Sequence, residues 1–120
     1  VQVQREQVKR VGGDEAGLAG LLLSLGAALC GEGRLDEAVE VLREAIAIFR
    51  RLHGNEHLST ARALLNLGST RLVQGRFDEA LMDMKEGLRI LRQVHGDEHP
   101  EVADALNNIA TVHHKQGKYP

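Results

Sequence analysis

The residues with a spacing suited to chemistry are two pairs of histidines. The strings HGNEH at 53–57 and HGDEH at 95–99 each hold two histidines four residues apart. Imidazole is a common zinc ligand, and on one continuous helix this spacing would align two such ligands. Gly54 and Gly96 interrupt the pairs, however, and favour turns between structural units. We therefore interpret both strings as turns and expect no metal site.

The other candidates for chemistry are weaker. Cys30 lies in an apolar helical stretch without an activating neighbour, so we expect a packed or groove-lining thiol and not a nucleophile. The string GEG at 31–33 lacks the third glycine and the preceding strand of a dinucleotide-binding motif. His113 and His114 are adjacent on a helix, so their side chains point apart. We predict no catalytic residue, no metal and no cofactor, and hence no enzyme.

Composition sets the class of protein. The 120 residues are 42% hydrophobic and 27% charged, which is typical of one folded, soluble domain. Only 2% are aromatic and the net charge is −2, which argues against binding to nucleic acid or a membrane. The single cysteine fits a cytoplasmic (intracellular) location. The chain begins without methionine, so we expect it to be a piece of a longer protein.

The glycines mark an internal repeat. Gly33, Gly75 and Gly117 are 42 residues apart, and the string GRLDEA returns one period later as GRFDEA. The segments 12–53 and 54–95 are identical at 15 of 42 aligned positions, where ordinary amino-acid usage would give about three. The chain is therefore built by duplication.

Each repeat contains two helical patterns, because apolar residues recur at intervals of three and four. Leu18, Leu22, Leu25 and Leu29 form the first such stripe. The glycine at each Gly-Arg corner can end a helix in the left-handed conformation, and Pro100 suits the first position of a helix. We predict an all-α fold, a right-handed α-solenoid of antiparallel helix-turn-helix repeats with five to six helices.

The third repeat should stop after its first helix. We divide this single repeat domain, residues 1–120, into 1–11 as the end of a preceding helix, 12–53 as repeat 1, 54–95 as repeat 2, and 96–120 as partial repeat 3. Small residues at Gly26 and Gly68 should let the two helices of a repeat approach closely. We expect Leu106, Ile109 and Val112 to lack a packing partner, which could support self-association.

These motifs resemble the tetratricopeptide repeat. Its Leu-Gly pair in the first helix and its Gly-Lys/Arg corner followed by an aromatic, an acidic residue and Glu-Ala have counterparts at 25–26 and 33–38. The 42-residue period and HGDEHPEVADALNNIA are similar to repeats of kinesin light chains and their relatives in nephrocystin-type and NLR-type proteins. Leu22, Leu29 and Arg71 depart from the family pattern, since they replace aromatic residues.

The resemblance implies that the first helices line a concave groove, which binds an extended peptide or a helix of a partner protein. The helical period then predicts its lining as Arg62, Leu65, Asn66, Ser69, Asp104, Asn107, Asn108, Thr111, His114 and Lys115, with Leu23, Ala27, Cys30 and Leu72 or Val73 beside them. The resemblance also implies that the amides of Asn66 and Asn108 recognise a peptide backbone. The alternatives are that these two side chains brace adjacent helices or face water.

The function implied is a non-catalytic scaffold for protein–protein interaction. Two alternatives remain open: a structural role in which copies of the chain stack end to end as a homo-oligomer, and a regulatory arm of a larger multidomain protein.

Overall fold

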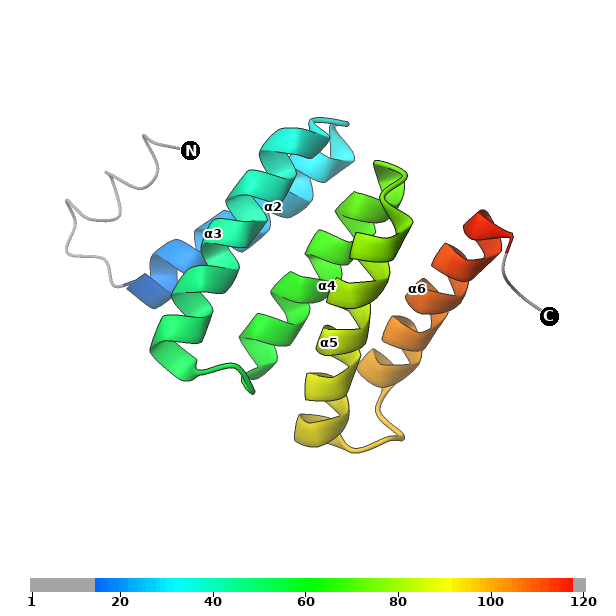
Figure 1. Ribbon diagram of the computed structural model, residues 1–120. Coiled ribbons are helices and arrows are strands. Elements are labelled where there is room, and N and C mark those ends of the chain that lie inside the picture. Colours follow the sequence, from blue (N-terminus) through cyan, green and yellow to red (C-terminus); the bar gives the residue numbers. More distant parts are fainter. Residues whose placement is uncertain (1–14, 118–120) are drawn as a thin grey trace.

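The structure, a computed structural model, describes residues 15–117. In this range the chain forms five α helices and no strand, namely α2 (Glu15–Gly31), α3 (Leu35–His53), α4 (Leu58–Val73), α5 (Phe77–His95) and α6 (Pro100–Gln116). Helices α2 and α3 form one hairpin, α4 and α5 form the next, and α6 lies at the end of the array (Figure 1). The predicted all-α solenoid is confirmed. The expected helix at 1–11 lies outside the described residues.

The Gly-Arg corners close the first helix of each hairpin as predicted. Gly33 and Gly75 have φ angles of 81° and 80°, a conformation that glycine adopts without the steric cost of a side chain. The second helix starts two residues later, and its first turn carries two carboxylates, Asp36 and Glu37 in α3. These charges are favourable at the positive end of the helix dipole.

Histidine side chains cap the helices that follow the turns between repeats. His57 and His99 are the N-cap residues of α4 and α6, and each Nδ1 accepts a hydrogen bond from the backbone N–H two residues later. Pro100 occupies the first helical position, as predicted. The cap satisfies one backbone donor that the helix itself leaves free.

Close approach within each hairpin depends on a glycine of the first helix. A Cβ built on Gly26 would lie 2.5 Å from Leu42 Cδ2, and a Cβ on Gly68 would lie 2.7 Å from Met84 Cγ. Both distances are too short for a side chain, so the large residue of the second helix rests directly on the glycine. The prediction that these glycines allow close packing is confirmed.

The array curves toward its first helices. α4 contacts both α2 and α6, whereas α3 and α5 have no Cα atoms within 8 Å of each other. The first helices are therefore closer together than the second helices, which makes their side the inner side of the curve. We call the exposed surface of α2, α4 and α6 on this side the inner face.

One expectation for the third repeat is wrong. Val112 was expected to lack a packing partner, but it is fully buried against Ala80 and Met84. The side of α6 that carries Val112 faces the second repeat, so α5 covers it. Ile109 is half-buried for the same reason, and only Leu106 of the three is exposed.

Candidate partner-binding surface

Seven of the ten predicted lining residues occupy positions that recur on the first helices. They are Arg62, Asn66, Ser69, Asp104, Asn108, Thr111 and Lys115, which are all exposed or half-buried. Each of four residues on α6 follows its counterpart on α4 by 42 residues: Asp104 follows Arg62, Asn108 follows Asn66, Thr111 follows Ser69 and Lys115 follows Val73. On a helix, these four positions share one side. The seven residues therefore belong to one surface on the inner face.

The other three predicted residues occupy a different side of the helix. Leu65 packs toward α5, because a Cβ on Gly87 would lie 3.0 Å from Leu65 Cγ. Asn107 comes one 42-residue period after Leu65, and His114 comes one period after the half-buried Leu72. In repeat 2 these two positions face the second helix. Leu65, Asn107 and His114 thus lie beside the inner face and not on it.

Ser24 was not predicted from the sequence, and the choice between Leu72 and Val73 was left open. Ser24 precedes Asn66 by one 42-residue period and is exposed, while Val73 is exposed at the C-terminal end of α4. The repeat register itself was the signal that could have found both. In α2 the four recurring positions hold Gly20, Ser24, Ala27 and Gly31, so polarity on the inner face rises from repeat 1 to repeat 3.

The amides of Asn66 and Asn108 are available for a ligand. Both residues are half-buried, and among the described residues neither side-chain amide forms a hydrogen bond. The hydrogen bond at Asn66 involves its backbone carbonyl, which accepts from the Thr70 hydroxyl at 2.9 Å. This geometry argues against the alternative that the two amides brace neighbouring helices.

Arg62 is the member of this surface that already has a strong partner. Its Nε and Nη2 donate to the two carboxylate oxygens of Glu101, each at 2.9 Å, and so join α4 to α6. These hydrogen bonds are the main cause that lowers the pKa of Glu101 to about 2. His95 Nε2 lies 2.9 Å from Glu101 Oε1 and supports the same charge. Arg62 therefore braces repeats 2 and 3.

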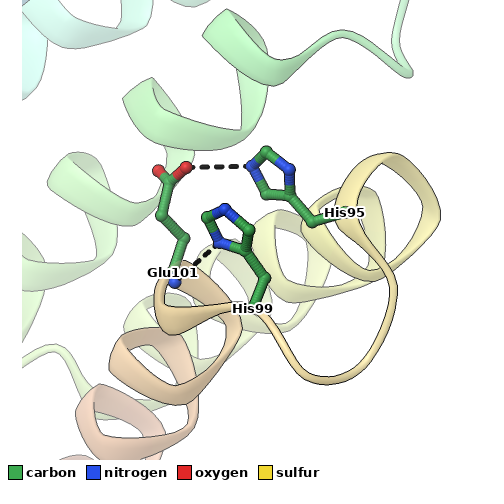
Figure 2. A group of neighbouring side chains, drawn as sticks. All are labelled: His95, His99 and Glu101. Carbon is green, nitrogen blue, oxygen red and sulfur yellow. Dashed lines mark hydrogen bonds and ion pairs between the residues drawn. The ribbon is translucent and has the colours of Figure 1, made fainter.

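The turns between repeats bring each histidine pair together, which the sequence analysis did not expect. The rings of His95 and His99 stack with centroids 3.7 Å apart and planes 9° apart (Figure 2). The rings of His53 and His57 stack in the same way at 4.2 Å. Glycine lets the chain turn back after the helix, so that the first ring covers the capping ring of the next helix.

This cluster has the chemistry of a hydrogen-bonded brace. Ligand atoms of His95, His99 and Glu101 lie within 4.8 Å of one another. An imidazole binds a metal in its ring plane at about 2.1 Å, and two nearly parallel rings cannot both direct a lone pair at one ion. His99 Nδ1 also serves as the helix cap (Figure 2). Glu101 is also held by Arg62. A metal would have to displace these contacts.

An ion pair between α4 and α5, on the side away from the inner face, was not predicted from the sequence. Arg71 Nη1 donates to Asp83 Oδ2 at 2.9 Å, and their side chains are only 14% and 13% exposed. Burial raises the pKa of Asp83, and Arg71 opposes this rise. The pair lines a cavity of about 530 Å³ between α3 and α5, beside Arg43 and Arg50. We call this the outer cleft.

The single cysteine lies within the first hairpin. Cys30 is half-buried in α2 and packs against the hydrophobic core of the described residues. No helix in the described range is both long and apolar enough to cross a membrane.

Comparisons with known proteins identify the repeat. The family described as tetratricopeptide repeat matches residues 17–93 and, in a second overlapping match, residues 63–120. The crystal structure of BtubC (BKLC) from P. vanneervenii is similar over 87% of this chain, with a TM-score of 0.81 and 23% sequence identity. This chain spans 41% of that structure's length, so the similarity concerns the fold. Among curated proteins the sequence has no match.

Proposed function

The chain belongs to the tetratricopeptide repeat family, in the 42-residue, kinesin light chain-like form, and from this we propose that its inner face binds an extended peptide of a partner protein. Repeats of this family indicate a scaffold for protein–protein interaction in general, and the family is typically non-catalytic. We propose accordingly that the chain is not an enzyme and acts in the cytoplasm.

The observation that carries the proposal is the equivalence of Asn66 and Asn108. They are one period apart, both are accessible on the inner face, and neither amide has a hydrogen-bond partner among the described residues. An amide both donates and accepts, as a peptide backbone does.

The spacing of these amides fits an extended ligand. Packed helices lie about 8–10 Å apart, and an extended chain rises about 3.3 Å per residue. Asn66 and Asn108 would therefore meet backbone groups about three residues apart. Ser69 and Thr111, one turn further along each helix, add hydroxyl groups beside them.

Selection from a displayed library of random peptides supplies a probe for this function. A selected peptide should shift the amide NMR signals of Asn66, Ser69, Asn108 and Thr111 on the isotope-labelled chain. Signals of Arg43 and Arg50 in the outer cleft serve as the internal control. Binding that shifts only the outer-cleft signals would contradict the proposal.

Self-assembly is a second candidate function, favoured by one observation. Leu106 is 42% exposed on α6, whereas Leu22 and Leu64, at the equivalent positions of repeats 1 and 2, are buried. In those repeats the second helix of the hairpin covers this side. An exposed apolar side of a helix can associate with another chain.

A further inference from the structure

The outer cleft is a groove whose walls both belong to complete hairpins. Its volume is about 530 Å³. The wall from α3 carries Arg43, Ala47 and Arg50, the wall from α5 carries Glu79 and Asp83, and α4 lies beneath them. The packing of repeat 1 on repeat 2 therefore sets the shape of the cleft.

The two arginines of α3 lie on one side of the helix and are unpaired. Arg43 and Arg50 are seven residues apart, which is about 10.5 Å along a helix axis. Both are exposed, and within residues 15–117 neither guanidinium forms a hydrogen bond or an ion pair. Arg50 attracts Asp83 and Glu86 only at longer range. Ala47 is exposed between the two arginines, so this wall offers two cations with space between them.

The carboxylates of the opposite wall already have partners. Arg71 Nη1 donates to Asp83 Oδ2 at 2.9 Å, and Arg71 Nη2 lies 3.9 Å from Glu79 Oε2. Glu86, beside the cleft on α5, accepts from Arg89 Nη2 at 2.8 Å. The charges of the cleft that are left without a contact partner are therefore the positive charges of α3.

The groove continues along α3 into a second cavity of about 520 Å³, which shares Arg43. This second cavity carries the carboxylates of Asp36, Glu40 and Glu44, with Arg76 as its other cation. Anionic groups of a ligand are therefore favoured in the outer cleft and disfavoured beyond it.

We propose that the outer cleft binds a helix of a partner protein that carries two carboxylates seven residues apart, which meet Arg43 and Arg50. Two such carboxylates share one side of their helix and are about 10.5 Å apart, as the two arginines are. In an extended chain this distance corresponds to about three residues, which places the two side chains on opposite faces. The small side chain of Ala47 leaves room for the partner helix, and the opposite charges favour the encounter.

This surface is separate from the inner face, so the proposal goes beyond the proposed function. Ion pairs at an exposed surface contribute little individually. The complex should therefore be weak, and salt should weaken it further.

An NMR titration of the isotope-labelled chain tests the proposal. The probe is an alanine-based, stapled helical peptide of about 18 residues with two glutamates seven residues apart. It should shift the amide signals of Arg43, Ala47 and Arg50 at up to millimolar concentrations. Raising the NaCl concentration from about 50 mM to about 500 mM should increase the dissociation constant several-fold.

Matched peptides and variants test the charges and their spacing. A peptide with glutamine in place of both glutamates, and one with the glutamates five residues apart on opposite sides of the helix, should each bind about fivefold more weakly or worse. Arg43→Gln with Arg50→Gln should weaken binding of the original peptide by a similar factor. Lys85→Gln is the control, because Lys85 follows Arg43 by one period and is exposed outside the cleft. This variant should leave the affinity unchanged.

Three results would overturn the proposal. The first is no shift of the outer-cleft signals at millimolar peptide, and the second is an equal shift with the glutamine peptide. The third is tighter binding in the cleft by an unstapled acidic peptide that stays extended. Asn66→Ala with Asn108→Ala should leave the affinity for the helical peptide unchanged, so this test is independent of the proposal for the inner face.

Discussion

Arg71 and Asp83 form a buried ion pair in repeat 2 at the two positions where repeat 1 has an apolar pair. Arg71 is 42 residues after Leu29, and Asp83 is 42 residues after Val41. Leu29 and Val41 are buried in the first hairpin, whereas Arg71 donates to Asp83 at 2.9 Å in the second. Both members of the pair differ between the repeats, and each charge in repeat 2 is matched by its partner across the two helices.

Breaking this ion pair should cost more than replacing it. Arg71→Leu removes the hydrogen-bonded partner of the Asp83 carboxylate and leaves only the more distant charge of Arg50, and we expect a loss of about 1–3 kcal/mol in the free energy of unfolding. Arg71→Leu with Asp83→Val restores the pair found in repeat 1. A buried ion pair gains little stability over apolar residues of similar size. The free energy of unfolding of the double variant should therefore be within about 1 kcal/mol of the wild-type value, or higher than it.

Urea unfolding followed by circular dichroism measures all three chains. The single variants Arg71→Leu and Asp83→Val should both unfold at lower urea than the double variant. If the loss of unfolding free energy in the double variant equalled the sum of the losses in the two single variants, the two positions would not be coupled. The comparison with repeat 1 would then be wrong.

Two glycines in first helices should respond to alanine in opposite ways. A Cβ on Gly68 would lie 2.7 Å from Met84 Cγ and 3.1 Å from the Ala80 carbonyl oxygen, so Gly68→Ala should force the hairpin apart and destabilise it by about 1–3 kcal/mol. A Cβ on Gly20 meets nothing within 4 Å. Gly20→Ala should therefore stabilise the chain by about 0.5–1 kcal/mol through helix propensity.

Thermal unfolding of the two alanine variants provides the measurement. Gly20→Ala is the matched control for Gly68→Ala, since both substitutions add the same methyl group to a first helix. Equal shifts of the two melting temperatures, in either direction, would rule out steric contact as the reason for glycine at position 68.

The brace between repeats 2 and 3 should weaken in acid. Hydrogen bonds from Arg62 lower the pKa of Glu101 from 4.5 to about 2 in the folded chain. A carboxyl whose pKa is lower in the folded state stabilises the fold above its unfolded pKa, and this contribution is lost as the pH falls. For Glu101, the loss should occur between about pH 4.5 and pH 2.

Unfolding free energies of the wild type and of Glu101→Gln, measured across this range of pH, isolate the effect. The difference between the two chains should be largest above pH 5 and should shrink toward pH 2. Glu40→Gln, at an exposed carboxylate on α3, is the control for a general charge effect. A difference that stays constant with pH would contradict the assigned role of Glu101.

The sequence predicted the helices well because local chemistry determines them. Gly33 and Gly75 permit the corners, Pro100 starts α6, and Gly26 and Gly68 admit the large residues of the second helices. Each of these features depends on a residue and its near neighbours, and the 42-residue period then repeats it along the chain.

The predictions that failed concern which neighbour each side of a helix contacts. The period shows which residues share a side, but not whether that side faces solvent or the next helix. This ambiguity placed Leu65 on the inner face and left Val112 without a partner, whereas α5 contacts both. The stacking of His95 on His99 likewise depends on the path of the turn.

The central claim is that Asn66 and Asn108 on the inner face bind the backbone of a partner peptide. Isothermal titration calorimetry of a library-selected peptide should give a dissociation constant about tenfold or more higher for Asn66→Ala with Asn108→Ala than for the wild type, since each amide contributes about 0.5–1.5 kcal/mol. Arg43→Ala in the outer cleft, as the control, should leave affinity unchanged. Unchanged affinity in the asparagine variant, or a loss of affinity only in Arg43→Ala, would contradict the claim.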